Sequence, residues 1–178
     1  MKIGLVRHLK VKKEKPTQFI TEGELFQWVQ EYDGAEIEDY REHIEEVEWV
    51  QCYSSDMERA VKTASYLFQG EVKQIKELRE IPIYPFHLRN VKMPFVLWMF
   101  LFRFAWLMNH KTQKEAKAAV KCRVRKVIDQ IESENEGDTL IVSHGALMIY
   151  LNKELIKRGF IGPKLTRAKN GVLYLYEK

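Results

Sequence analysis

The chain has 178 residues, of which 46% are hydrophobic and 30% are charged, and its formal net charge is +4. That length suits a single domain with a sizeable core over residues 1–178 and leaves little room for a second domain. The composition excludes a disordered or fibrous chain, and the small positive charge favours anionic partners only weakly.

The two cysteines, Cys52 and Cys122, lie far apart in the sequence and have no metal-type spacing, so we expect neither a disulfide framework nor a zinc site. Both are predicted to be buried thiols. The N-terminal apolar stretch is much shorter than the hydrophobic region of a secretory signal. These features predict a cytoplasmic protein that needs neither a metal nor another cofactor.

The first half of the chain begins with an apolar run, residues 2–6, which predicts a buried strand. Thr21 and Glu24 form a capping box, which predicts the start of a helix. Asp33 and Gly34 indicate that this helix ends there or turns soon afterwards.

A second strand is predicted over residues 47–54, and a helix follows it with apolar residues at helical spacing from Met57 to about Leu67. Ser55 or Asp56 is expected to cap this helix. The sequence after it, EVKQI, predicts a third short strand.

The second half contains a capping box of Thr112 and Glu115, which predicts a long helix that ends near Glu134. Residues 140–142 then predict a buried strand that leads into another helix, and residues 172–176 predict a final alternating strand. Strands that alternate with helices indicate a three-layer α/β domain.

Two of the predicted strands end in a histidine. The first runs into Arg7 and His8, and the strand over residues 140–142 runs into His144 and Gly145 at the start of a helix. Ligands of open α/β sheets bind at the carboxyl ends of the strands, so both histidines are expected at the ligand edge. The amides of the helix N-terminus at Gly145 are predicted to bind an anion.

A third strand end supplies Arg59, one turn into the next helix. Arginine matches phosphate oxygens with paired hydrogen bonds, and a neutral imidazole can attack phosphorus. Two histidines, two arginines and a helix N-terminus therefore predict a site for a phosphoryl group that needs no metal. The leaving oxygen also needs a proton donor, for which Glu77 and Glu80 are both candidates.

At these positions the sequence resembles the histidine phosphatase superfamily, also called the phosphoglycerate mutase-like family. The family's first motif, a strand followed by Arg-His-Gly, is similar to LVRHL at residues 5–9. Its second, Ser-Ser-Asp-Leu-x-Arg-Ala-x-x-Thr-Ala, is similar to SSDMERAVKTA at residues 54–64. LRE at residues 78–80 and VSHG at residues 142–145 follow in the family's order, so the likeness spans four blocks.

The resemblance implies a role for each matching residue. His8 would be the nucleophile that becomes phosphohistidine, and Arg7, Arg59 and His144 would form the rest of the phosphate pocket. Glu80, which fills the Glu of the family's Leu-x-Glu pattern, would be the general acid and then the general base. The implied fold is an α/β/α sandwich with a mixed, mostly parallel sheet, and the implied substrate-selecting lid is the insertion at about residues 81–111.

The sequence departs from the family pattern directly after the first histidine. Leu9 stands where the family has glycine, which removes the conformational freedom of a residue without Cβ at a tight turn. A small polar residue that often follows is replaced by the stretch KVKK. Its lysines and Lys15 form either a solvated loop or a positive surface that attracts an anionic substrate.

The segment over residues 94–108 is apolar except for Arg103. As a helix it would rise about 22 Å, too short to cross a bilayer core of about 30 Å. It is open to three interpretations: a buried core helix, a lid over the catalytic pocket, or a surface for a membrane or a second subunit, which Arg89, Lys92 and Lys111 flank. We favour a lid that also forms a contact surface. His87 and His110 nearby are interpreted as structural.

These observations predict a metal-independent phosphatase that acts on a small phosphomonoester through phosphohistidine at His8. Two alternatives remain open: a mutase-type phosphoryl transfer, and a non-catalytic relative that binds an anionic ligand, a partner or a membrane. No nucleic-acid partner and no transmembrane segment are expected. Contact with a membrane or a second copy of the chain is expected through residues 94–108.

Overall fold

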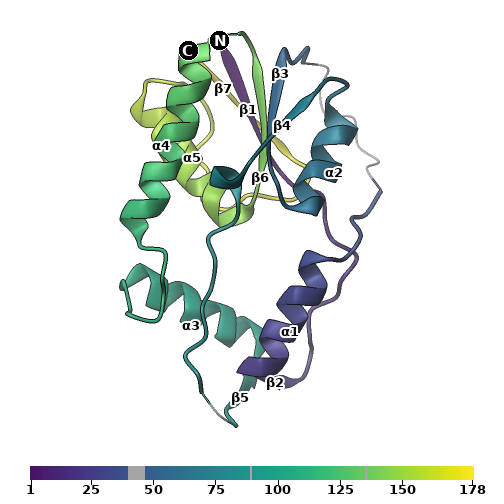
Figure 1. The fold of residues 1–178 in the computed structure, drawn as a ribbon, viewed down its shortest axis with the longest axis vertical. Helices are drawn as coiled ribbons and strands as arrows, with labels where there is room; N and C mark the ends of the chain where they lie inside the picture. Colours follow the sequence, from purple (N-terminus) through teal and green to yellow (C-terminus); the bar gives the residue numbers. More distant parts are fainter. Residues whose placement is uncertain (40–46, 89, 135) are drawn as a thin grey trace.

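A five-stranded sheet is the centre of the fold, with its strands in the order β4-β3-β6-β1-β7 (Figure 1). The computed structural model describes residues 1–39, 47–88, 90–134 and 136–178. All neighbouring strands are parallel except β7, which is antiparallel to β1. The strands are β1 (Lys2–Arg7), β3 (Gln51–Ser55), β4 (Val72–Ile75), β6 (Thr139–Ser143) and β7 (Leu173–Glu177).

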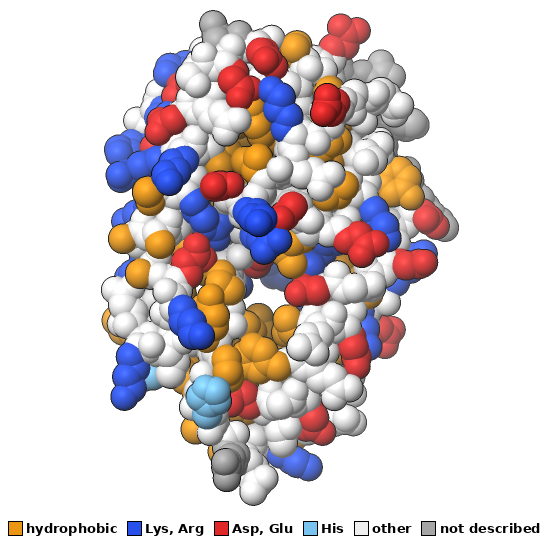
Figure 2. Space-filling view, in the orientation of Figure 1, with side chains coloured by type: hydrophobic (Ala, Val, Ile, Leu, Met, Phe, Trp, Pro, Cys, Tyr) orange, Lys and Arg blue, Asp and Glu red, His pale blue; other side chains and the backbone are white. Residues whose placement is uncertain are grey.

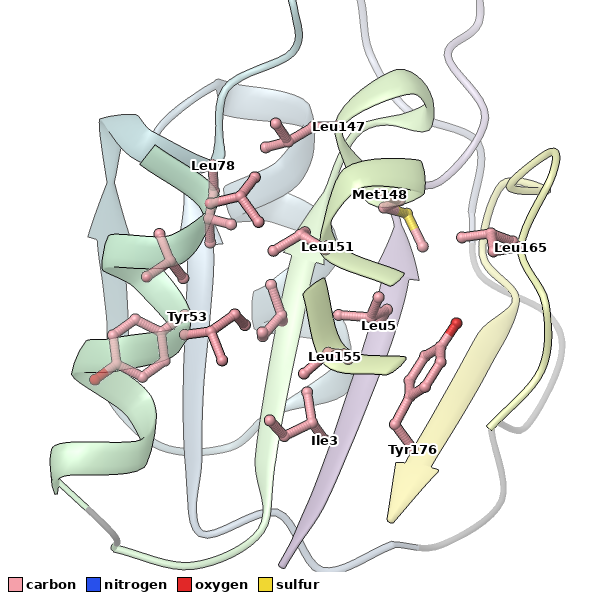
Figure 3. Packing of buried hydrophobic residues seen from close by; sticks show 14 of the residues in the cluster. Ile3, Leu5, Tyr53, Leu78, Leu147, Met148, Leu151, Leu155, Leu165 and Tyr176 are labelled. Atoms are coloured by element: carbon pink, nitrogen blue, oxygen red, sulfur yellow. The ribbon is translucent and has the colours of Figure 1, made fainter. Parts of the chain in front are cut away.

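Helices cover both faces of this sheet, as the sequence predicts for a three-layer fold. Helix α2 (Glu58–Leu67) packs on the face that carries Val6 and Val142, while α4 (Lys117–Glu134) and α5 (Gly145–Lys157) pack on the face that carries Leu5 and Ile141. The strands are apolar on both faces because both faces are buried. Figure 3 shows the larger of the two cores, where Leu147, Met148, Leu151 and Leu155 of α5 lie against Ile3 and Leu5 of β1.

A smaller group of elements lies beyond the carboxyl ends of the parallel strands (Figure 1). It contains α1 (Glu22–Asp33), α3 (Phe95–Leu107) and a two-stranded antiparallel sheet of β2 (Phe19–Thr21) and β5 (Lys92–Pro94). Its own apolar cluster is centred on five buried side chains: Ile20, Leu25, Phe95, Trp98 and Phe102. Neither this small sheet nor its pairing was predicted from the sequence.

The aromatic segment forms α3, which is apolar on all sides except at Arg103 but is buried on only one side. Phe95, Trp98 and Phe102 are buried, whereas Phe100 and Phe104 on the opposite side are 62% and 52% exposed. The interpretation of this segment as a fully buried core helix is therefore wrong. Within the described ranges, no helix has the length and hydropathy that a membrane span requires. Arg89, one of the flanking cations, lies outside the described residues.

Helix α1 begins and ends as the sequence predicts. Thr21 and Glu24 make both hydrogen bonds of the capping box, and Gly34 follows the last turn. The predicted second capping box is wrong, because α4 begins only at Lys117. Thr112 instead bonds to His110, and the carboxylate of Glu115 binds Arg123.

Three further predictions need correction. The N-cap of α2 is Met57, and no side chain caps it, since Asp56 binds Arg79 in a bidentate ion pair. Strand β3 is shorter than predicted and begins at Gln51. Cys52 is buried, and burial raises its pKa to about 12, whereas Cys122 is exposed on α4.

The parallel register brings the ends of three strands to one edge of the sheet. Arg7 at the end of β1 lies beside Ser143 at the end of β6, and Ser55 ends β3 on the other side of β6. Each of these strands continues into a loop or a helix that faces α1 and α3 (Figure 1). Figure 2 shows that the molecule is hollowed between the part that contains the sheet and the part that contains α1 and α3. This edge is where the fold can bind a ligand.

Candidate active site

Two buried histidines lie side by side at the carboxyl edge of the sheet. His8 follows β1 and His144 follows β6, and their ring centroids are 5.1 Å apart. Both side chains are almost completely buried, at 2% and 1% exposure. Burial is the largest cause that lowers the pKa of each histidine well below its usual value, and the charges of Arg59 and Arg7 lower both further. Both imidazoles are therefore neutral at pH 7.

The hydrogen bonds of His8 define its tautomer. Its Nδ1 lies 2.7 Å from the carbonyl oxygen of Leu9, which can only accept, so Nδ1 carries the proton. Arg59 Nε can only donate, and it lies 3.3 Å from His8 Nε2, so Nε2 carries the lone pair. This arrangement leaves Nε2 as a potential nucleophile in a basic environment.

Arg59 is the most tightly held of the basic groups. Its side chain is 4% exposed, and its Nη1 donates to Asp33 Oδ1 at the end of α1 over 2.7 Å. Its guanidinium also lies 5.3 Å from the centroid of the Tyr32 ring. Thr63, one turn later on α2, donates to the Arg59 carbonyl and accepts from the amide of Leu9. Thr63 thus connects the loop after β1 to helix α2 through a hydrogen bond.

Arg7 and His144 each have one buried polar atom without a hydrogen-bond partner in the described part of the chain. Arg7 Nη1 donates to the carbonyl oxygen of Ala168, and His144 Nε2 lies 2.9 Å from Ser55 Oγ. Among the described residues, Arg7 Nε and His144 Nδ1 are buried and have no hydrogen-bond partner. Buried polar atoms without partners are rare in proteins, and these two suit a ligand that carries oxygen atoms.

Gly145 makes room for Arg7. A Cβ atom at position 145 would lie 3.3 Å from both Nε and Cζ of the Arg7 guanidinium, closer than ordinary van der Waals contact. The glycine after the second histidine therefore has a packing reason to be there. Its predicted contact with a phosphate stays a prediction.

The amides that follow Gly145 are occupied by a carboxylate of this chain. Glu80 accepts from the amides of Ala146 and Leu147 at the start of α5, each over 3.1 Å. A helix N-terminus stabilises a negative charge, so α5 holds the Glu80 carboxylate at its first turn, which directly follows His144. Glu77, the other predicted candidate, is exposed, and its carbonyl oxygen accepts from Arg123.

The other singled-out residues do not join this cluster. Lys10, Lys12 and Lys13 pair with Glu38, Glu36 and Glu31, which reduces the positive field of their loop. His110 bonds to Thr112, and His87 is exposed with a positive φ of 64°.

Leu9 adopts an ordinary backbone conformation although it replaces a family glycine. The described non-glycine residues with positive φ are His87, Asn90 and Asn109, and Leu9 is not among them. Its side chain is buried in a small apolar cluster with Val11 and Ile37. The substitution therefore adds packing without backbone strain.

We expect Leu9→Gly to destabilise the protein by about 3 kcal/mol, because it removes a buried side chain and increases the entropy of the unfolded chain. Urea unfolding followed by circular dichroism measures this change. Lys12→Gly, at an exposed position of the same loop, is the control for the backbone effect alone. A variant as stable as the wild type would show that Leu9 packs poorly.

Several neighbours of the site were not predicted. Ser55 and Thr63 lie inside the SSDMERAVKTA block, and this position in a family motif could have indicated that they lie near the site. Asp33 was interpreted only as a residue of a helix end or turn, yet it binds Arg59. Asn170 was not singled out as a site residue, yet its Nδ2 donates to the carbonyl oxygen of His8. Their roles depend on the tertiary fold and leave no local pattern.

Metal-binding groups are not a feature of this edge. Across the part of the chain that the structure describes, no three His, Cys, Asp or Glu side chains are grouped to hold a metal ion. The charge that could balance an anion here belongs to Arg7 and Arg59.

Solved structures share the whole fold at low sequence identity. The alpha-ribazole phosphatase from Shigella flexneri has a TM-score of 0.59 and 20% identity, with 98% of this chain and 89% of that chain covered. A phosphoglycerate mutase from Bacillus anthracis has a TM-score of 0.61, 20% identity and coverages of 98% and 86%. A mycobacterial glucosyl-3-phosphoglycerate phosphatase has a TM-score of 0.59 and 18% identity, with 98% of this chain and 88% of that chain covered. These similarities confirm the predicted phosphoglycerate mutase-like fold.

The family is established by the sequence comparison. No curated protein sequence matches the chain significantly. The model of the histidine phosphatase superfamily (branch 1), however, matches residues 33–176, which is most of the chain. With a fold and a buried histidine pair that agree with this match, the chain belongs to the histidine phosphatase superfamily.

Proposed function

We propose that this protein is a phosphatase that hydrolyses a phosphomonoester through a phosphohistidine at His8, without a metal. The observation that carries the proposal is the hydrogen-bond geometry of His8, which assigns the proton to Nδ1 and places Nε2 3.3 Å from Arg59 Nε in a buried basic cluster. A neutral imidazole is nucleophilic only through its unprotonated nitrogen, and that nitrogen is directed at the group suited to hold a phosphate.

In the first step, His8 Nε2 attacks the phosphorus atom and forms the N–P bond while the bond from phosphorus to the leaving oxygen breaks. Arg59 and Arg7 stabilise the negative charge on the phosphoryl oxygens. Neutral His144 donates to them from Nδ1, in the tautomer whose Nε2 accepts from Ser55 Oγ. Glu80 in its protonated form gives its proton to the leaving oxygen, so the product is a neutral alcohol.

In the second step, the carboxylate of Glu80 accepts a proton from water as the water oxygen attacks phosphorus. The N–P bond breaks, inorganic phosphate leaves, and His8 returns to its neutral state. Glu80 regains the proton that it gave away, so one water is consumed per ester. The amides of Ala146 and Leu147 hold the carboxylate in place during both steps.

Hydrolysis is favoured over the two alternatives. Two of the three structural neighbours described above are named as phosphatases and one as a mutase. A purely anion-binding relative would need no unprotonated nitrogen beside Arg59. Leu9, the feature that favours such a relative, causes no backbone strain at the site.

Residues 81–111 act in this proposal as the lid that selects the substrate. The described part of this segment lies beyond the strand ends, and Arg103 Nη1 donates to the carbonyl oxygen of Ile81, close to Glu80 in the sequence. Phe86 stacks on Phe102, with ring centroids 4.8 Å apart. An apolar lid of this kind suits a leaving group with hydrophobic character.

The test is turnover of a generic aryl phosphate in the presence of a chelator, together with trapping of the intermediate. We expect inorganic phosphate to be released without added metal, and an acid-labile, base-stable phosphoenzyme whose modified peptide contains His8. Absence of turnover, or a phosphate on another residue, would contradict the mechanism. Transfer to an added alcohol in place of water would favour the mutase alternative.

Asp33→Asn is expected to lower the KM for the phosphate ester about three- to tenfold, because the carboxylate of Asp33 competes with the substrate for Arg59. The inhibition constant of inorganic phosphate should fall by the same factor. Steady-state kinetics measure both values. Glu31→Gln, which removes another acidic group of α1, is the matched control. A large fall in kcat would instead mean that Asp33 orients Arg59 for the reaction.

A further inference from the structure

Helix α3 presents an outward face made of large apolar side chains. This outward face consists of six residues that are between 42% and 73% exposed: Val96, Leu97, Phe100, Phe104, Leu107 and Met108. They recur at helical spacing on the side opposite Phe95, Trp98 and Phe102, which pack into the protein. An apolar patch that follows a whole helix is unusual on a monomeric protein and marks a contact surface.

The segment that contains this face carries Lys and Arg but no acidic residue. From residue 81 to residue 114 the sequence contains five basic residues and no Asp or Glu. Lys92, Lys111 and Lys114 are exposed at the two ends of α3. Within the described ranges, none of these three lysines forms a salt bridge. The positive charge is therefore available to an external partner.

One carboxylate does lie near the N-terminal end of the helix. Hydrogen bonds from Thr21, with a smaller effect of Lys92, lower the pKa of Glu24. Glu24 is engaged by the cap of α1, where it accepts from the amide and the hydroxyl of Thr21. Lys111 and Lys114, at the other end of α3, are the less compensated cations.

We propose that the outward face of α3 binds the surface of an anionic lipid bilayer. The helix has 13 residues and is about 20 Å long, shorter than a bilayer core of about 30 Å, so it lies along the interface and does not cross it. Its apolar side chains enter the boundary between headgroups and acyl chains, while Lys92, Lys111 and Lys114 contact anionic headgroups.

The charge distribution favours a bilayer over a second copy of the chain. A symmetric dimer through this face would place the basic residues of one copy close to those of the other, without acidic groups in the segment to offset them. An anionic membrane offers the opposite charge across the whole face and accepts apolar side chains without a matching shape.

The experiment is sedimentation with two kinds of vesicle, one of phosphatidylcholine alone and one that also contains about one-third phosphatidylserine. We expect the wild type to bind the anionic vesicles, and the double variant Phe100→Ser, Phe104→Ser to bind at least about tenfold more weakly. Ile161→Ser, which removes an apolar side chain that is 82% exposed and outside α3, is the matched control and should bind normally. Circular dichroism verifies that each variant is folded.

A second variant tests the charge. Lys111→Glu combined with Lys114→Glu should abolish the preference for anionic vesicles, and raised salt should have the same effect on the wild type.

The proposal is overturned if the wild type sediments with neither vesicle. It is also overturned if the wild type forms a dimer in analytical ultracentrifugation that the double serine variant abolishes, because a second copy would then cover the face. Vesicle sedimentation does not depend on catalytic turnover, so a negative result for lipid binding would not contradict the phosphatase proposal.

Discussion

His8→Ala is expected to lower kcat for an aryl phosphate by at least about 10⁴-fold, because the variant lacks the nitrogen that attacks phosphorus. KM should change much less, since Arg7, Arg59 and His144 still bind the phosphate. Stopped assays with a chromogenic ester measure both parameters. The same variant should give no trapped phosphoenzyme.

His110→Ala is the control for the loss of a histidine, because His110 bonds to Thr112 in the exposed loop after α3. It should keep wild-type turnover. Equal activity of His8→Ala and the wild type would rule out His8 as the nucleophile. The alanine variant should remain folded, since His8 has no charge to bury in the native state and its neighbours Arg59 and Asp33 keep their ion pair.

Glu80→Gln is expected to have the second largest effect, a loss of about 10²- to 10⁴-fold in kcat for an alkyl phosphate. Glutamine has a similar shape and can still accept from one amide of α5, but it can neither donate nor take the catalytic proton. A nitrophenyl ester should lose much less in its first step, because nitrophenolate leaves without protonation. The ratio of the two losses, measured by initial rates, is the signature of a general acid.

Glu77→Gln is the matched control, since Glu77 lies three residues earlier and is exposed. It should leave both rates unchanged. Equal losses for the alkyl and the nitrophenyl ester in Glu80→Gln would indicate that Glu80 only holds the start of α5 in place. Loss of activity in Glu77→Gln alone would reverse the assignment of the two carboxylates.

Much of the central sheet could be predicted because its signals are local. The strands β1 and β6 are continuous apolar runs, and each ends where the polar site residues begin, so the pattern indicates both the strand and its functional end. Both hydrogen bonds of the capping box join Thr21 and Glu24, which are three residues apart, so the sequence alone was enough to predict them. The meeting of Arg7, His8, Arg59 and His144 followed from the edge rule for parallel strands.

Several other features could not be predicted because groups outside the local pattern compete for the same atoms. Thr112 and Glu115 have the spacing of a capping box, but His110 and Arg123 bind their side chains, and α4 starts later. The amides at the start of α5 suit an anion, but Glu80, 66 residues away from Ala146, occupies them. For α3, an apolar pattern on all sides contains no information about which side is buried.

The place of β1 in the sheet also affects how the protein is made. β1 (Lys2–Arg7) is synthesised long before its partners β6 and β7, which begin at Thr139 and Leu173. At a typical synthesis rate, roughly ten seconds pass before β6 follows it, and during that time Ile3, Leu5 and Val6 have no native strand to pair with. The central sheet therefore cannot form around β1 until β6 has been made. During that time the lysines that follow His8 lie next to these apolar residues in the sequence and oppose their aggregation.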